Sequence, residues 1–213
     1  MNPRQTFRNL SEEKQERITR VALEEFGEKG YAGASINFMV ERLGIAKGSV
    51  FQYFGDKKGL FLFVFNKTTD MVKDYLRAVR DQTKDEDLFT RLEATLMAGS
   101  LFLREHPLIY RVYIKVMYEY DVPFRKEILQ ALREHSLKFL RSLLETAKER
   151  GELKKDLDLN RMAFVLDALM DRFLQAHMVP HLDAGLGLYQ CDESVSAAWV
   201  KELTAVIRAG IGQ

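Results

Sequence analysis

The sequence lacks the features that mark disulfide-bonded, secreted or membrane-spanning proteins. Cys191 is the only cysteine among 213 residues, so no disulfide can form within the chain. The longest apolar run, residues 60–65, is far shorter than the roughly 20 residues that cross a bilayer. The first residues also lack the apolar core of a secretory signal. We therefore expect a protein of the reducing cytoplasm that has no membrane partner.

Proline and strand-forming patterns are equally scarce. The chain has only four prolines, and no stretch alternates apolar and polar residues for long enough to indicate a strand. Apolar residues instead recur with the period of an α-helix. We expect Ser11 to cap the first helix and residues 181–192 to form a loop. The sequence predicts an all-α protein of about nine helices, near residues 12–30, 35–43, 47–54, 56–80, 88–104, 108–118, 123–150, 159–178 and 194–211.

The net charge of +1 is too small to identify a partner, but its distribution is uneven. Residues 1–58 carry ten Lys and Arg against eight Asp and Glu, a net charge of +2. Residues 59–213 carry twenty-two against twenty-three, a net charge of −1. A phosphate-facing surface is therefore expected only in the N-terminal segment, although this excess alone does not prove one.

Residues 35–58, with the sequence SINFMVERLGIAKGSVFQYFGDKK, predict two short amphipathic helices joined by a tight turn. Ser35 is a good N-cap for the first helix, and Gly44 supplies the left-handed backbone that ends it. The packing of such a pair fixes the angle at which the second helix can enter the major groove of DNA. The segment therefore indicates a helix-turn-helix. Its expected apolar contacts involve Ile36, Met39, Val40, Leu43, Ile45, Val50, Phe54 and, from the preceding helix, Phe26.

From Gly30-Tyr31 onward, and above all in LGIAKGSVFQYFGDKKGLF at residues 43–61, the chain resembles the N-terminal domain of the TetR family of transcriptional regulators. The resemblance covers roughly residues 12–62, and the remainder is similar to the family only in length and helical rhythm. It implies a three-helix DNA-binding domain over residues 1–58 and a larger effector-binding and dimerisation bundle over residues 59–213. The matching positions are Gly44, Ile45, Gly48, Val50, Phe54, Lys57 and Leu60.

The resemblance also implies which residues face DNA. Ser35 would contact a phosphate, and Lys57 would clamp the DNA backbone at the start of the fourth helix. The second helix of the pair would present Lys47, Gly48, Ser49, Gln52 and Tyr53. These residue types suit the task, because glycine permits close approach of the helix backbone and an amide can pair bidentately with adenine.

The chain departs from the family pattern at two positions of this helix. Ala46 stands where the family usually has Ser or Thr, so the helix loses a side-chain cap and one hydroxyl contact to DNA. Phe51 stands where the family usually has a tyrosine whose phenol reaches a phosphate. Both changes alter the expected contacts without breaking the packing.

Aromatic and methionine residues recur at helical spacing after Lys84, and the resemblance implies an effector cavity between these helices. Most of these residues are expected to be core. We expect an apolar or aromatic effector rather than a highly charged one, because Asp167, Asp171 and Arg172 can pair with one another. No cofactor is expected. The candidates for lining the cavity are Phe102, Tyr113, Met117, Phe139 and Phe173.

The two last predicted helices, residues 159–178 and 194–211, are apolar on more than one side and need a second burial partner. The resemblance implies a four-helix bundle with the same helices of a second subunit. Such a homodimer would bind a pseudo-palindromic operator, usually as a repressor that a small molecule releases. The residues that suit the seam are Val195, Trp199, Leu203, Val206, Ile207 and Gly210.

An enzyme and a protein-binding adaptor are the two alternative classes of function. Di-iron enzymes on helical bundles need Glu-x-x-His pairs, but the residues three before the four histidines are Leu or Met, and no glycine-rich phosphate loop is present. His177 and His181 have the spacing of metal ligands, but Pro180 interrupts the turn and no third ligand is evident. We therefore expect neither an enzyme nor a metal site. The alternative is a helical adaptor that binds protein without sequence-specific DNA binding.

Overall fold

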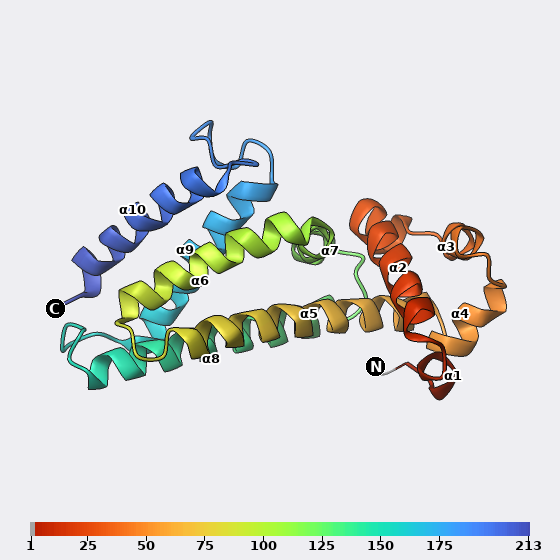
Figure 1. Ribbon diagram of the computed structural model, residues 1–213, viewed down its shortest axis with the longest axis horizontal. Helices are drawn as coiled ribbons and strands as arrows, with labels where there is room; N and C mark the ends of the chain where they lie inside the picture. The colour runs from red at the N-terminus through yellow and green to blue at the C-terminus, as the bar shows by residue number, and fades with distance from the viewer. Residues whose placement is uncertain (1–2) are drawn as a thin grey trace. The chain divides into compact units, whose positions relative to one another are not determined.

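The computed structural model describes residues 3–213, which form ten α-helices (Figure 1). The all-α prediction is confirmed, and the one additional helix is the single turn α1, which is too short to show a period. The helices are α1 (Gln5–Arg8), α2 (Glu12–Gly33), α3 (Ile36–Leu43), α4 (Lys47–Phe54), α5 (Lys57–Gln82), α6 (Leu88–Glu105), α7 (Pro107–Tyr118), α8 (Arg125–Glu149), α9 (Leu159–Met178) and α10 (Glu193–Ile211).

The helix ends mostly follow the local signals in the sequence. The Ser35 hydroxyl accepts a hydrogen bond from the Phe38 N–H at 3.3 Å, and Gly44 has the left-handed φ of 65° that the turn requires. Asp56 caps α5 by accepting from the Gly59 N–H at 2.7 Å. The expected cap at Ser11 is wrong in detail, because Ser11 occupies the N-cap position but its side chain makes no cap hydrogen bond.

The predicted end of the first helix at Gly30 corresponds to a kink. The backbone of Gly30 leaves helical geometry with φ of 68°, and α2 then continues to Gly33. A β-carbon at Gly30 would meet the carboxylate of Glu119, the residue directly after α7. The kink therefore lies where α2 and α7 pass closely.

The helices form two compact units. The first unit contains the described residues up to Lys73 together with Leu108–Leu129, and the second contains Asp74–Pro107 and Gln130–Gln213. The first unit therefore holds α7 as well as α1 to α4, and α5 and α8 contribute to both units. The place of α7 was not foreseen, because periodicity shows which face of a helix is buried but not which helix covers it.

In the first unit, aromatic side chains hold the end of α4. The ring of Phe54 lies 4.8 Å from that of Phe7 in α1 and 5.1 Å from that of Phe63 in α5, measured between centroids. A β-carbon at Gly59 would lie only 2.0 Å from the Phe54 carbonyl oxygen. Only glycine therefore lets the first turn of α5 pass this closely against the end of α4.

In the second unit, α6 packs against both α9 and α10. One core cluster joins α6, α8, α9 and α10 around the fully buried Leu92 and Leu144. A second cluster joins Leu96 of α6, Phe173 of α9 and Val200 of α10. None of the helices formed by residues 3–213 is long and apolar enough to span a bilayer.

The predicted loop after α9 is present and is held by one carboxylate. Asp183 is buried and accepts hydrogen bonds from the N–H groups of Leu188 at 2.8 Å and Gly185 at 3.2 Å. His177, at the base of the loop, has both ring nitrogens engaged, one with the Phe173 carbonyl and one with the Ser196 hydroxyl, each at 2.9 Å. Residues 3–213 contain no group of three or more metal-ligating side chains placed to share an ion.

Candidate nucleic-acid interface

The helices α3 and α4 are neighbours in the fold (Figure 1). The side on which they pack is apolar. Met39, Val40 and Leu43 of α3 are buried, as are Val50 and Phe54 of α4. Of the three remaining members of the predicted set, Phe26 of α2 is buried, and Ile36 and Ile45 are half-buried. The predicted helix-turn-helix packing is thus confirmed, and it leaves the opposite side of α4 free.

Most of the residues predicted to face DNA lie on this free side. Lys47, Gly48 and Gln52 are exposed, whereas Ser49 and Tyr53 are half-buried. A β-carbon at Gly48 would meet no atom of the chain within 4 Å. The fold itself therefore does not require glycine at this helical position, where alanine would be more stable.

The N-terminal end of α4 lacks a side-chain cap, as expected. Ala46 occupies the N-cap position and makes no side-chain hydrogen bond to the helix. The free N–H groups of the first turn therefore remain open to an outside acceptor, and helix N-termini favour phosphate.

The segment before α2 lies along the C-terminal half of α4. The Arg4 N–H donates to the Tyr53 carbonyl at 3.0 Å, and the Thr6 hydroxyl donates to the Gln52 carbonyl at 3.1 Å. The ring of Tyr53 also packs edge-on against Phe7, with centroids 5.9 Å apart. Arg4 is exposed and thus adds a cation beside α4 that the sequence did not reveal, because a single turn carries no periodic signal.

A buried carboxylate positions Ser35. The Ser35 N–H donates to Glu25 of α2 at 2.9 Å, and Glu25 is buried. This hydrogen bond compensates part of the cost of removing a carboxylate from water. Sequence reasoning missed Glu25, since it looked like one more charged residue on the exposed side of an amphipathic helix.

Lys57 is held by the chain itself. Its ammonium donates to the Ala32 carbonyl at 3.1 Å and lies 4.9 Å from the centroid of the Tyr31 ring. Burial lowers the pKa of Lys57, and the nearby Glu25 carboxylate partly opposes this effect. Because an ammonium has three donors, these contacts position it without using all of its hydrogen-bonding capacity.

Two phenylalanines are exposed on the helix-turn-helix. Phe38 of α3 is 47% exposed and Phe51 of α4 is 42% exposed. The Arg42 guanidinium lies 5.7 Å from the Phe38 ring centroid and pairs with Glu24 at 2.8 Å. From the sequence, Phe51 was expected only to lack a phenol, whereas the structure shows an accessible apolar surface on both helices.

The five candidates for lining an effector cavity are divided between the two units. Tyr113 and Met117 lie on α7 in the first unit and are half-buried. In the second unit, Phe102 is buried against Tyr75 and His106. The other two lie in different places, Phe139 beside the cluster around Leu92 and Phe173 within the cluster around Leu96.

The expected pairing among Asp167, Asp171 and Arg172 is wrong. Both aspartates pair with Arg133 of α8, each at 3.0 Å. Arg172 instead donates to the Leu182 carbonyl at 2.7 Å. The reason is that α8 packs close to α9, a contact between residues far apart in the sequence.

Two family models match the chain. The model described as "Bacterial regulatory proteins, tetR family" matches residues 18–64, which include α3 and α4. The model described as "Tetracyclin repressor-like, C-terminal domain" matches residues 86–211, which is more than half of the chain.

Solved structures and sequence relatives point the same way. A crystal structure of a TetR family transcriptional regulator from Chloroflexus aurantiacus J-10-fl is 31% identical, with a TM-score of 0.75 and 100% of each chain covered. The uncharacterized HTH-type transcriptional regulator YezE of Bacillus subtilis (strain 168) is 30% identical over 68% of this chain and 76% of YezE. YuxN of the same strain, likewise an uncharacterized HTH-type regulator, is 29% identical over 66% of this chain, and the match spans 48% of YuxN.

The Glu25 carboxylate gives a test of how α3 is held. We expect Glu25→Ala to lower the free energy of unfolding by about 1–3 kcal/mol, because the Ser35 N–H loses its acceptor. Glu25→Gln keeps an acceptor oxygen and should cost less. Urea unfolding followed by circular dichroism measures both changes, and equal losses in the two variants would contradict the assigned role of this hydrogen bond.

Proposed function

This chain belongs to the TetR family of bacterial regulatory proteins, and on that premise we propose that it is a repressor that binds a pseudo-palindromic operator as a homodimer and is released by a small molecule. Membership makes the chain a helix-turn-helix transcriptional regulator rather than an enzyme, as the sequence predicted. It also disfavours the adaptor alternative. The observation that carries the proposal is the free side of α4, where Lys47, Gly48 and Gln52 are exposed.

We assign α4 to the major groove and its polar residues to separate tasks. Gln52 would contact a base, since its amide can pair bidentately with adenine, and Lys47, Ser49 and Tyr53 would contact the adjoining backbone or base edges. Gly48 would allow the helix backbone to come close. The DNA-binding part would end near residue 58, with Ser35 and Lys57 holding phosphates at its two edges.

The exposed rings of Phe38 and Phe51 fit the same surface. Apolar side chains can contact the methyl group of thymine in the major groove. An accessible ring on α4 would therefore favour thymine beside the base contacted by Gln52. This role compensates in part for the phenol that the family usually has at the position of Phe51.

Base contacts and phosphate contacts predict different mutational effects. Gln52→Ala should reduce discrimination at one operator position by about 1–3 kcal/mol, whereas Lys57→Ala should weaken binding to all DNA sequences alike and flatten the salt dependence. Mobility shifts on operator and scrambled duplexes over a range of salt concentrations measure both effects. Lys155→Ala, an exposed lysine of the second unit, is the matched control.

Unchanged operator binding by both variants would show that the assigned surface is wrong. Because Lys57 also bonds to the Ala32 carbonyl, thermal unfolding of Lys57→Ala must be checked alongside its DNA binding. A normal unfolding midpoint with weakened binding supports the phosphate contact.

An exposed apolar surface on α9 and α10 supports dimerisation. Phe164 of α9 is 64% exposed and Val206 of α10 is 70% exposed, and Val165 and Leu169 add further apolar area. Ala198, Trp199 and Glu202 line a shallow hollow on α10. Ile207, which was placed in the seam from the sequence, is instead buried in the core of its own subunit.

We expect Phe164→Glu to convert the dimer to a monomer, because a carboxylate at the seam would be desolvated without a partner. Size-exclusion chromatography with light scattering gives the mass directly. Tyr120→Glu places the same charge on an exposed aromatic residue of the other unit and should remain dimeric. A dimeric Phe164→Glu protein would place the subunit interface elsewhere.

The release step requires a ligand that prefers one arrangement of the helices over another. The proposed lining residues are Phe102, Tyr113, Met117, Phe139 and Phe173, and their character favours an apolar or aromatic effector. The helices α5 and α8 contribute to both units and thus provide a continuous connection through the chain. A shift of α5 would change the separation of the two DNA-binding parts in the dimer.

Titration of aromatic and aliphatic compounds into the protein–operator complex tests this coupling. An effector should weaken operator binding about 5- to 150-fold, which is the usual range of allosteric coupling. Met117→Ala should shift the effector concentration at half-release while leaving operator affinity without effector unchanged. If no apolar or aromatic compound alters operator affinity, the proposed effector class is wrong.

A further inference from the structure

Arg91 of α6 is a buried arginine whose side chain pairs with no described residue. Its relative exposure is 7%, and its Nε atom has no hydrogen-bond acceptor among residues 3–213. Its guanidinium also forms no ion pair within the part of the chain that the structure describes. An unpaired buried charge costs several kcal/mol, so such groups are rare in native proteins.

The charges near Arg91 do not compensate it. Burial lowers the pKa of Arg91, the Arg150 guanidinium lowers it further, and the Glu152 carboxylate raises it. Arg80 is a third cation close enough to lower it. Arginine nevertheless stays protonated in proteins, because its ordinary pKa lies far above neutral pH. Of the three charged neighbours that act on the pKa of Arg91, two are therefore cations and one is an anion.

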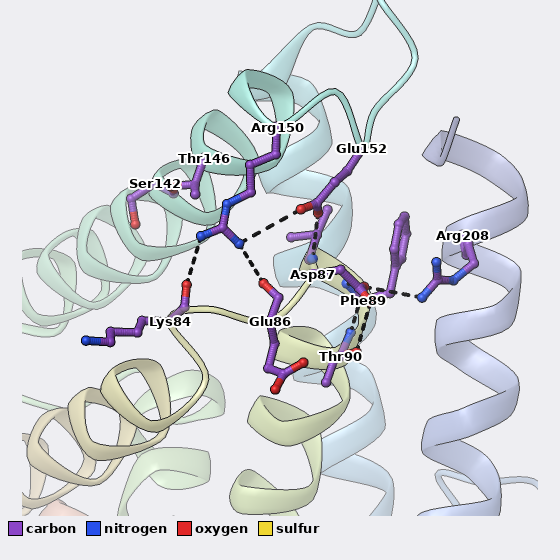
Figure 2. A network of polar contacts seen from close by, with 11 residues as sticks. Lys84, Glu86, Asp87, Phe89, Thr90, Ser142, Thr146, Arg150, Glu152 and Arg208 are labelled. Atoms are coloured by element: carbon purple, nitrogen blue, oxygen red, sulfur yellow. Dashed lines mark hydrogen bonds and ion pairs between the residues drawn. The ribbon is translucent and has the colours of Figure 1, made fainter.

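Glu152, the one carboxylate that acts on the pKa of Arg91, already has other partners. Figure 2 shows it between α8 and the start of α6, where it accepts from the Leu88 N–H at 2.7 Å and lies 4.0 Å from Arg150. Arg150 in turn donates to the carbonyl oxygens of Glu86 at 2.8 Å and Lys84 at 3.0 Å. Glu152 therefore caps α6 and neutralises Arg150 rather than Arg91.

Three ion pairs hold other charges of this region. Arg80 contacts Asp81 at 2.8 Å, and Asp87 contacts Arg208 at 3.3 Å while it caps α6 (Figure 2). With Arg150 and Glu152 as a third pair, the charge of Arg91 remains uncompensated. One negative charge brought from outside the chain would balance it.

We propose that Arg91 is the centre of an anion-binding site that takes a carboxylate or phosphate group of a small molecule. The guanidinium presents its donors as a planar fork that matches the oxygens of both groups. Arg91 itself supplies the unbalanced charge, because Arg150 and Arg80 have carboxylate partners of their own. This site does not depend on operator binding or on the aromatic effector.

Thermal unfolding of the full chain tests the site without any DNA. Inorganic phosphate, acetate and octanoate are each compared with chloride at equal ionic strength and pH. At ten times its dissociation constant, a bound anion should raise the unfolding midpoint by about 3–6 °C. A rise with phosphate identifies a free oxyanion as sufficient, whereas a rise with octanoate alone identifies an organic acid.

Arg91→Met removes the charge but keeps an unbranched side chain. We expect its midpoint in chloride to equal or exceed that of the parent, and its anion-dependent rise to disappear. Arg91→Lys keeps the charge without the fork and should show a reduced rise. Arg161→Met, at an exposed residue of the same unit, is the matched control and should respond like the parent.

Two results would overturn the site. One is that none of the three anions stabilises the parent protein more than chloride does. The other is an Arg91→Met protein that retains the full response. If Arg91→Met does not fold, the same anions are titrated into the parent and into Arg91→Lys by calorimetry. Equal affinities in these two proteins would exclude the forked contact and with it the proposed site.

Discussion

The packing around Phe54 sets the direction of α4, on which the DNA-binding surface depends. Phe7 and Phe63 enclose this ring, and Gly59 lets α5 begin directly against the Phe54 carbonyl. Because protein interiors are close-packed, such contacts allow little variation in helix orientation. The apolar side of α4 thus decides which of its polar residues remain available, among them Gln52.

The division of the helices between the two units determines which helices a ligand could act on to regulate DNA binding. α7 belongs with the helix-turn-helix, where Gly27 of α2 lies close to the Leu108 carbonyl and Lys58 of α5 lies 3.6 Å from the ring centroid of Phe124. A ligand that contacts α7, α5 or α8 would therefore act on elements that already touch or continue into the DNA-binding part. Its effect is limited by the difference between its affinities for the two arrangements.

Most buried polar groups among the described residues are satisfied, which makes Arg91 informative. Glu25 accepts from the Ser35 N–H, Asp167 pairs with Arg133, and His177 is bonded at both nitrogens. Each of these contacts fixes one helix or turn against another. Arg91 has the burial of such a group without the contacts, as expected of a residue whose partner comes from outside the chain.

The sequence by itself determined the helices, most of their ends and the helix-turn-helix, because these follow from apolar period, caps and turn residues within a few positions of one another. Ser35, Gly44 and Asp56 act as their residue types predict. Only the tertiary structure decided that α1 lies along α4, that Arg133 rather than Arg172 pairs with Asp167, and that Arg91 has no partner among residues 3–213. Those outcomes depend on which distant segments pack together, and local periodicity carries no information about that choice.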